Sequence, residues 1–212
     1  MQKKNAAVYG GTQKRVGTAP RKISAPAGVD REIALSLGVF RKNAAFVKSV
    51  SGKPNKLSDT TLYIAADASG FAGIQPILDS NTKKMVGITN FDGNTLNTGR
   101  NIVINGVRLM YTTDGDSVKS ADWQNNDRLP AELQNAEVVM KQGGEQIFAM
   151  PLTDLQGYKY DDWRKVTDRP FVRNNEPISI ELQIPSEVTV PLATATVKQF
   201  IRFEFRVTQS KS

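Results

Sequence analysis

The sequence predicts an all-β protein built as an antiparallel β-sandwich. From Thr60 onward, apolar and polar residues alternate in short runs, as is typical of sheets with one buried and one solvated face. Turn-forming residues separate these runs at short spacing. Strands do not alternate with long helical segments, which argues against a doubly wound parallel sheet.

The predicted strands begin after an exposed loop at 51–59 (SGKPNKLSD). Residues 60–66 (TTLYIAA) form the first strand and residues 85–91 (MVGITNF) form another. The segment before this loop is ambiguous. Residues 33–39 alternate as in a strand, and residues 44–50 fit either a short helix or a second strand.

The strongest hairpin signal lies at 100–113, where Asn105-Gly106 separates two alternating apolar runs. Asn-Gly favours a type I′ turn because both central residues need positive φ, so this dipeptide is the predicted structural turn. A second hairpin is predicted at 136–152, with Gly143-Gly144 in its turn.

The C-terminal third adds predicted strands at 176–185, 187–192 and 199–208. In the last of these, four apolar residues face one way and three charged residues the other: Ile201, Phe203, Phe205 and Val207 against Arg202, Glu204 and Arg206. The total is about nine or ten strands, a count within the usual range for two packed sheets. The expected helices are short, at 129–134 and around Ala44.

Positive charge is concentrated at the start of the chain. Residues 1–56 carry twelve Lys or Arg against two acids, whereas residues 57–212 carry sixteen bases and nineteen acids. Residues 1–31 therefore read as a basic arm, disordered or extended on its own, before a sandwich domain at 32–212. Such segregation favours a polyanion partner or contacts between subunits. The arm residues expected to make these contacts are Lys3, Lys4, Lys14, Arg15, Arg21 and Lys22, continued by Arg31, Arg41, Lys42 and Lys48.

Catalysis is not expected, because the chain contains neither cysteine nor histidine. Their absence excludes thiol nucleophiles, disulfides, the Ser-His-Asp arrangement and the common zinc sites. We expect no cofactor and no small-molecule substrate. No apolar run reaches the length of a membrane span, and the start lacks the apolar region of a signal peptide.

Two further groups of residues are candidates for binding. Trp123 and Trp163, the latter near Tyr158 and Tyr160, are predicted to be interface anchors, since aromatic residues are enriched at protein interfaces. An aromatic platform for sugars is the alternative. Asp114 and Asp116 form a weak candidate Ca²⁺ site, although they lack the spacing of an EF-hand loop.

The C-terminal stretch RNNEPISIELQIPSEVTVPLATATVKQFIRFEFRVTQ (173–209) resembles the closing strands of the jelly-roll capsid proteins of icosahedral viruses. The stretch NTGRNIVINGVRLMYTT (97–113) is similar to parts of the coat and penton proteins of tailless bacteriophages. The resemblance implies a single jelly roll and a place in the virion. It also implies self-assembly into a homo-oligomeric shell with other capsid proteins, and an arm facing genome, internal membrane or neighbouring subunits. It brings no catalytic residues.

Two functions of different classes follow. The first is a structural capsid subunit whose sandwich tiles the shell. The second is a carbohydrate-binding jelly-roll module on a viral particle or fibre. An enzyme that works with carboxylates has no specific support, because nineteen acids after residue 56 guarantee chance pairs.

Overall fold

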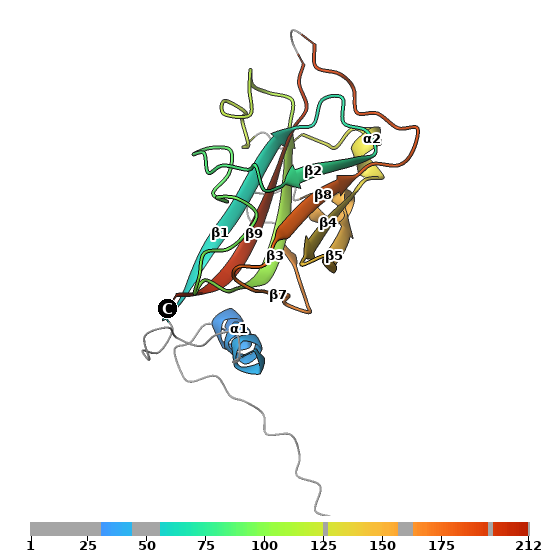
Figure 1. The fold of residues 1–212 in the computed structure, drawn as a ribbon. Coiled ribbons are helices and arrows are strands. Elements are labelled where there is room, and N and C mark those ends of the chain that lie inside the picture. The colour runs from blue at the N-terminus through green and yellow to red at the C-terminus, as the bar shows by residue number, and fades with distance from the viewer. Residues whose placement is uncertain (1–30, 44–55, 125–126, 157–162, 195–196, 212) are drawn as a thin grey trace, which may run out of the picture.

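The computed structural model describes residues 31–43, 56–124, 127–156, 163–194 and 197–211. Two antiparallel sheets lie face to face and a short helix lies against the end of one of them (Figure 1). The predicted all-β, antiparallel sandwich is therefore confirmed at the level of architecture.

The first sheet has five strands and the second has four. The first has the order β1-β9-β3-β6, with β7 also paired to β3; its strands are β1 (Lys56–Asp67), β9 (Phe200–Lys211), β3 (Ile102–Thr112), β6 (Arg164–Lys165) and β7 (Phe171–Val172). The second has the order β2-β8-β4-β5, with β2 (Ile74–Leu78), β8 (Ile178–Gln183), β4 (Glu137–Gln142) and β5 (Glu145–Pro151).

The strand pairs are nested along the sequence. β1 pairs with β9, β2 with β8, β3 with β6 and β7, and β4 with β5, all antiparallel. The first four strands therefore form one side of a long two-stranded ribbon. The later strands form the other side in reverse order, and the β4–β5 hairpin joins the two sides.

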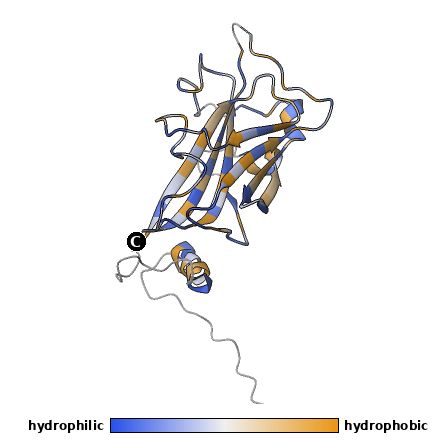
Figure 2. Ribbon diagram, viewed as in Figure 1, coloured by the Kyte–Doolittle hydropathy of each residue, from blue (hydrophilic) through white to orange (hydrophobic). Residues whose placement is uncertain are grey.

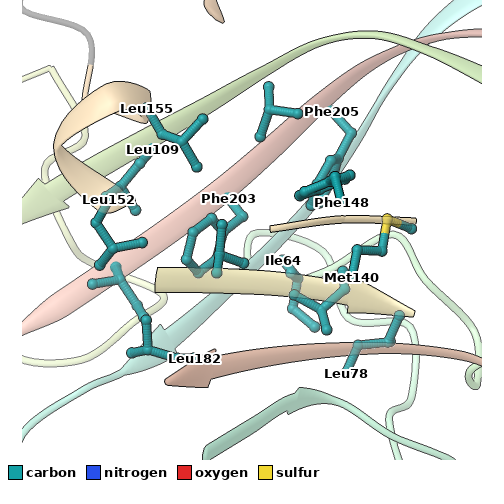
Figure 3. Packing of buried hydrophobic residues seen from close by; sticks show 14 of the residues in the cluster. Ile64, Leu78, Leu109, Met140, Phe148, Leu152, Leu155, Leu182, Phe203 and Phe205 are labelled. Carbon is teal, nitrogen blue, oxygen red and sulfur yellow. The ribbon is translucent and has the colours of Figure 1, made fainter. Parts of the chain in front are cut away.

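The core lies between the sheets and comes from the inward residues of the alternating strands. Figure 2 shows this as hydrophobic and hydrophilic bands along the long strands. On β9, Phe203 and Phe205 are at most 1% exposed, as the sequence predicts. They lie in one hydrophobic cluster with Phe148 and Met140 of the opposite sheet (Figure 3), and the ring centroids of Phe148 and Phe205 are 6.3 Å apart.

The predicted hairpin at Gly143-Gly144 is confirmed. Gln142 pairs with Glu145 across a two-residue turn, and φ is 59° at Gly143 and 87° at Gly144. Both central residues thus have the positive φ that a type I′ turn requires.

The predicted turn at Asn105-Gly106 is wrong. Both residues lie inside β3, which is one continuous, fully buried strand. Ile104 pairs with Val207 and Gly106 with Arg206, which leaves Asn105 as an extra residue in a β-bulge. A bulge shifts the inward phase by one residue, just as a two-residue turn does, so both produce the same apolar pattern.

The segment before β1 contains a helix rather than a strand. α1 spans Arg31–Lys42 and buries Ser36 and Phe40. The alternation at 33–39 was therefore misleading, because those residues also recur near the helical period. Residues 44–50, predicted as helix or strand, lie outside the described residues.

The structure also differs from three smaller predictions. Residues 56–59 belong to β1 rather than to an exposed loop. Residues 85–91 form a turn with isolated bridges, at whose tip Val86 is 88% exposed. The segment 187–192 makes a single bridge, from Thr189 to Ala72.

The other helices are single turns. α2 (Ala131–Gln134) confirms the helix predicted at 129–134, and α3 (Leu152–Leu155) follows β5. In the described part of the chain, none of the helices has both the length and the apolar character needed to cross a membrane.

Candidate interaction surface

The outer face of the first sheet carries charged residues in register across three strands. Glu204 of β9 lies between Tyr63 of β1 and Arg108 of β3. In the next outward row, Arg202 of β9 lies beside Met110 of β3. Strand pairing therefore places Arg108 beside Arg202 and Glu204, which are distant from it in the sequence.

These three charged side chains form a cluster in which Arg108 and Glu204 are buried and Arg202 is partly buried. Arg108 donates to Oε2 of Glu204 through Nη2, and also through Nε at 3.2 Å. Arg202 donates through Nε to the other carboxylate oxygen at 2.7 Å. The side chains of Arg108 and Glu204 are each 8% exposed. One carboxylate thus faces two guanidinium groups away from solvent, where removal of a single partner leaves an uncompensated charge.

Aromatic rings lie against the two arginines. The guanidinium carbon of Arg108 lies 4.5 Å from the ring centroid of Trp163. That of Arg202 lies 4.2 Å from the Tyr63 ring and 5.8 Å from the Trp123 ring. These are cation–π distances. Both tryptophans that the sequence singles out therefore lie on this face, each half-buried against an arginine.

Helix α1 covers the same face further along the strands. Its Ser36 is fully buried, with its hydroxyl 3.0 Å from Oδ1 of Asn105 and 3.2 Å from the hydroxyl of Thr208. Phe40 packs edge-on against Phe171, with ring centroids 5.7 Å apart. The helix thus docks through one apolar contact and a polar centre.

The β-bulge supplies this polar centre. Asn105 donates through Nδ2 to Thr208 at 2.8 Å and accepts a hydrogen bond from Arg169 at 2.8 Å. Thr208 in turn lies 2.9 Å from a carboxylate oxygen of Asp59. The side-chain amide of Asn105, the extra residue in β3, therefore bonds to α1, to β9 and to the 166–170 segment.

The predicted basic residues that can be described lie on α1. Arg31, Arg41 and Lys42 are all exposed, so a partner can reach them. On the side of the helix that faces the sheet, the carboxylate of the partly exposed Glu32 lies 3.8 Å from Arg206, whose side chain is exposed. The helix therefore contacts the sheet with its acid and presents its bases outward.

The other predicted contact residues fall outside the described part of the chain. They are Lys3, Lys4, Lys14, Arg15, Arg21, Lys22 and Lys48 of the basic segment, and Tyr158 and Tyr160 near Trp163.

The candidate metal site has little geometric support. The backbone oxygen of Asp114 accepts from the amide of Asp122 at 3.0 Å, which closes the loop between these residues. The backbone oxygen of Asp116 lies 2.5 Å from Nζ of Lys198. Among the residues that the structure describes, no group of three or more His, Cys, Asp or Glu is placed to hold a metal ion.

One ionisable group lies on the inward side of the first sheet. Burial, with smaller contributions from the nearby charges of Asp127 and Glu132, raises the pKa of Tyr111 to about 12. Its hydroxyl donates to Oε1 of Gln199. This phenol therefore stays neutral at ordinary pH and serves as a hydrogen-bonding group.

Sequence reasoning missed the cluster of Arg108, Glu204 and Arg202. It assigned the charged side of β9 to solvent, because alternation alone does not reveal whether anything covers the outer face. Three alternating charges in FIRFEFRV were the available signal. They become meaningful only once pairing to β3 places Arg108 opposite Glu204.

Comparison with models of known protein families, with curated proteins and with solved structures gave no match to this chain.

Proposed function

We propose that this chain is a structural subunit of a viral capsid, built on a single jelly roll with a basic N-terminal arm. The observation that carries the proposal is the nested strand pairing. A jelly roll is an eight-stranded antiparallel ribbon rolled into two sheets of four. Its strands therefore pair first with last, second with seventh, third with sixth and fourth with fifth.

Both sheets of this protein fit that scheme when β6 and β7 count as one interrupted strand. The two short strands pair antiparallel with the same strand, β3, at successive positions. The sheet orders β1-β9-β3-β6 and β2-β8-β4-β5 then correspond to the two sheets of a roll. This support concerns the fold, which also occurs outside viruses.

The charge distribution supports the assembly role. The excess of bases in residues 1–56 includes Arg31, Arg41 and Lys42 on the exposed side of α1. Positive charge of this kind would attract a polyanion or the acidic surface of a neighbouring subunit. The carbohydrate-binding alternative depends on Trp123 and Trp163, and both rings lie against arginines, which leaves less ring surface for a sugar.

The test is the size distribution of the purified chain by light scattering across a range of salt, with and without added nucleic acid. The expected result is closed particles or stable rings of subunits, formed in a salt-dependent way. A chain that stays monomeric under all of these conditions would overturn the proposal.

Two variants separate the basic helix surface from net charge. The triple variant Arg31→Gln, Arg41→Gln, Lys42→Gln should weaken association or reduce its salt dependence. The control Lys83→Gln, Lys119→Gln, Arg128→Gln removes the same charge from exposed positions elsewhere and should assemble like the parent. Equal effects would show that net charge alone matters.

Removing residues 1–29 tests the division into arm and sandwich. The described core lies entirely within later residues, so the truncated chain should melt within a few degrees of the parent and lose assembly or polyanion binding. A much lower melting temperature would show that the arm belongs to the fold.

A further inference from the structure

A small cavity lies where the connection from β2 to β3 passes the free side of β1. This connection, residues 79–101, lies beside β1 in Figure 1. The cavity is about 110 Å³ in volume, and Leu62 of β1 lies against it. Its polar lining includes Lys84, Asp92, Thr95 and Arg100.

The walls of the cavity are held on both sides. Asn90 donates through its side chain to the carbonyl of Thr61 and accepts from the amide of Tyr63, both at 2.8 Å. The carbonyl of Asn94 accepts from the amide of Ile178 at 2.6 Å. The connection is thus fixed to both sheets, and a ligand would meet a preformed site rather than pay to order a loop.

Arg100 is the group that makes the cavity suited to an anion. It is half-buried, and its Nε donates to Oε1 of Gln209 at 2.8 Å. Burial lowers the pKa of Arg100, although a guanidinium remains protonated in proteins. Within the described part of the chain, no acceptor is bonded to its Nη1 and Nη2 atoms. These two nitrogens can donate side by side to a carboxylate or phosphate.

Two further charges line the cavity. Lys84 adds a second cation and Asp92 an anion. Among the described residues neither takes part in an ion pair. Two cations and one carboxylate leave one positive charge in a small polar space, which suits a single anionic group.

We propose that this cavity binds an oxyanion, either a phosphate or a carboxylate group, through the terminal nitrogens of Arg100 and the ammonium of Lys84. Thr95 and Asn97 also line the cavity and can supply neutral donors. The site shares no residue with the basic surface of α1 and does not depend on a role in assembly.

The experiment is calorimetric titration of the full chain with inorganic phosphate and, separately, with acetate, in chloride buffer at constant ionic strength. Arg100→Gln should weaken binding about tenfold or more, because a hydrogen bond to a charged group is lost. Lys84→Gln should weaken it about threefold. Asp92→Asn should strengthen it by a similar factor, because it removes a nearby negative charge.

The matched control is Lys83→Gln, which removes the exposed lysine next to Lys84 and does not line the cavity. It should bind like the parent. Tighter binding of phosphate than of acetate identifies a phosphate group as the ligand chemistry, and the reverse order identifies a carboxylate.

Three results would overturn the proposal: no binding of either ion, equal losses for Lys83→Gln and Lys84→Gln, or no gain for Asp92→Asn. Asp92 is exposed, so its substitution should leave the fold intact, and the expected result is tighter anion binding. This substitution therefore tests the site even where Arg100→Gln disturbs the fold.

Discussion

The outer faces of the two sheets carry similar residues in different surroundings. On the first sheet, Arg108 and Glu204 form an ion pair with each side chain 8% exposed. On the second, Lys141 and Glu181 form one at 2.7 Å with side chains 33% and 19% exposed. Both pairs link neighbouring strands, so strand geometry does not explain the difference.

What differs is the cover. Trp163 and Trp123 lie over the first sheet and α1 buries Ser36 and Phe40 against it, whereas the pair on the second sheet remains partly open to water. When a covered ion pair loses one partner, water cannot reach the remaining charge to solvate it, so the loss is strongly destabilising. The same residue types therefore act as structural groups on one face and as surface charges on the other.

The largest effect should come from Glu204→Gln. The substitution keeps the shape but leaves two guanidinium groups without a carboxylate in a covered site. We expect a loss of about 3–5 kcal/mol in the free energy of unfolding, measured by urea denaturation. A loss below about 1 kcal/mol would show that water reaches the cluster and would remove the distinction between the two faces.

A smaller loss is expected for Thr208→Val, which removes a hydroxyl from the polar centre beneath α1. Asn105 and Asp59 would each lose a partner, at a cost of about 1–3 kcal/mol. The control on the open face is Ser179→Val, opposite Lys141 on β8. There water can replace the hydroxyl and a β-branched residue suits a strand, so stability should be nearly unchanged.

The glycines sharpen the comparison at the level of the backbone. Gly144 has φ of 87° in the open hairpin and nothing within 4 Å of an added Cβ, so Gly144→Ala should cost about 1–2 kcal/mol through conformation alone. Gly106, in the covered sheet, has no positive φ, and an added Cβ would lie 3.4 Å from the carbonyl oxygen of Arg164. Gly106→Ala should therefore lower the melting temperature less than Gly144→Ala does. The opposite order would indicate that Gly106 has the positive φ of a turn.

The smallest effect should be that of Glu181→Gln. An ion pair that is still partly exposed to water contributes about 1 kcal/mol or less, and this contribution should shrink further at high salt. Urea melts at low and high salt would measure it. A loss comparable with that of Glu204→Gln would mean that the second sheet is also covered, by a partner for instance.

Sequence alone predicted which residues face the core. The alternation of Ile201, Phe203 and Phe205 survives in the structure because a one-residue slip would place the whole apolar set in water. The hairpin at Gly143-Gly144 was also within reach, since two glycines permit a turn that few residues allow.

The pairing of distant strands and the cover of the outer face were beyond such reasoning. Asn105-Gly106 shows why: a bulge and a turn leave the same apolar pattern, and only the neighbours of β3 distinguish them. Helix α1 was missed because its most buried position holds Ser36, which breaks the apolar stripe of an amphipathic helix. That serine becomes intelligible only beside Asn105 and Thr208, and the arginine cluster only once β3 lies beside β9.

The position of β9 between β1 and β3 has a consequence for the kinetics of folding. Residue 56 pairs with residue 211, and residue 67 with residue 200, so the central strand of the first sheet can pair with β1 only after a very long loop has closed. Closing such long loops is slow, and until it happens the adjoining edges of β1 and β3 have no strand between them. During that interval the chain is open to pairing with other copies of itself. Its yield of native protein should therefore fall steeply with concentration during refolding, even where the finished sandwich is stable.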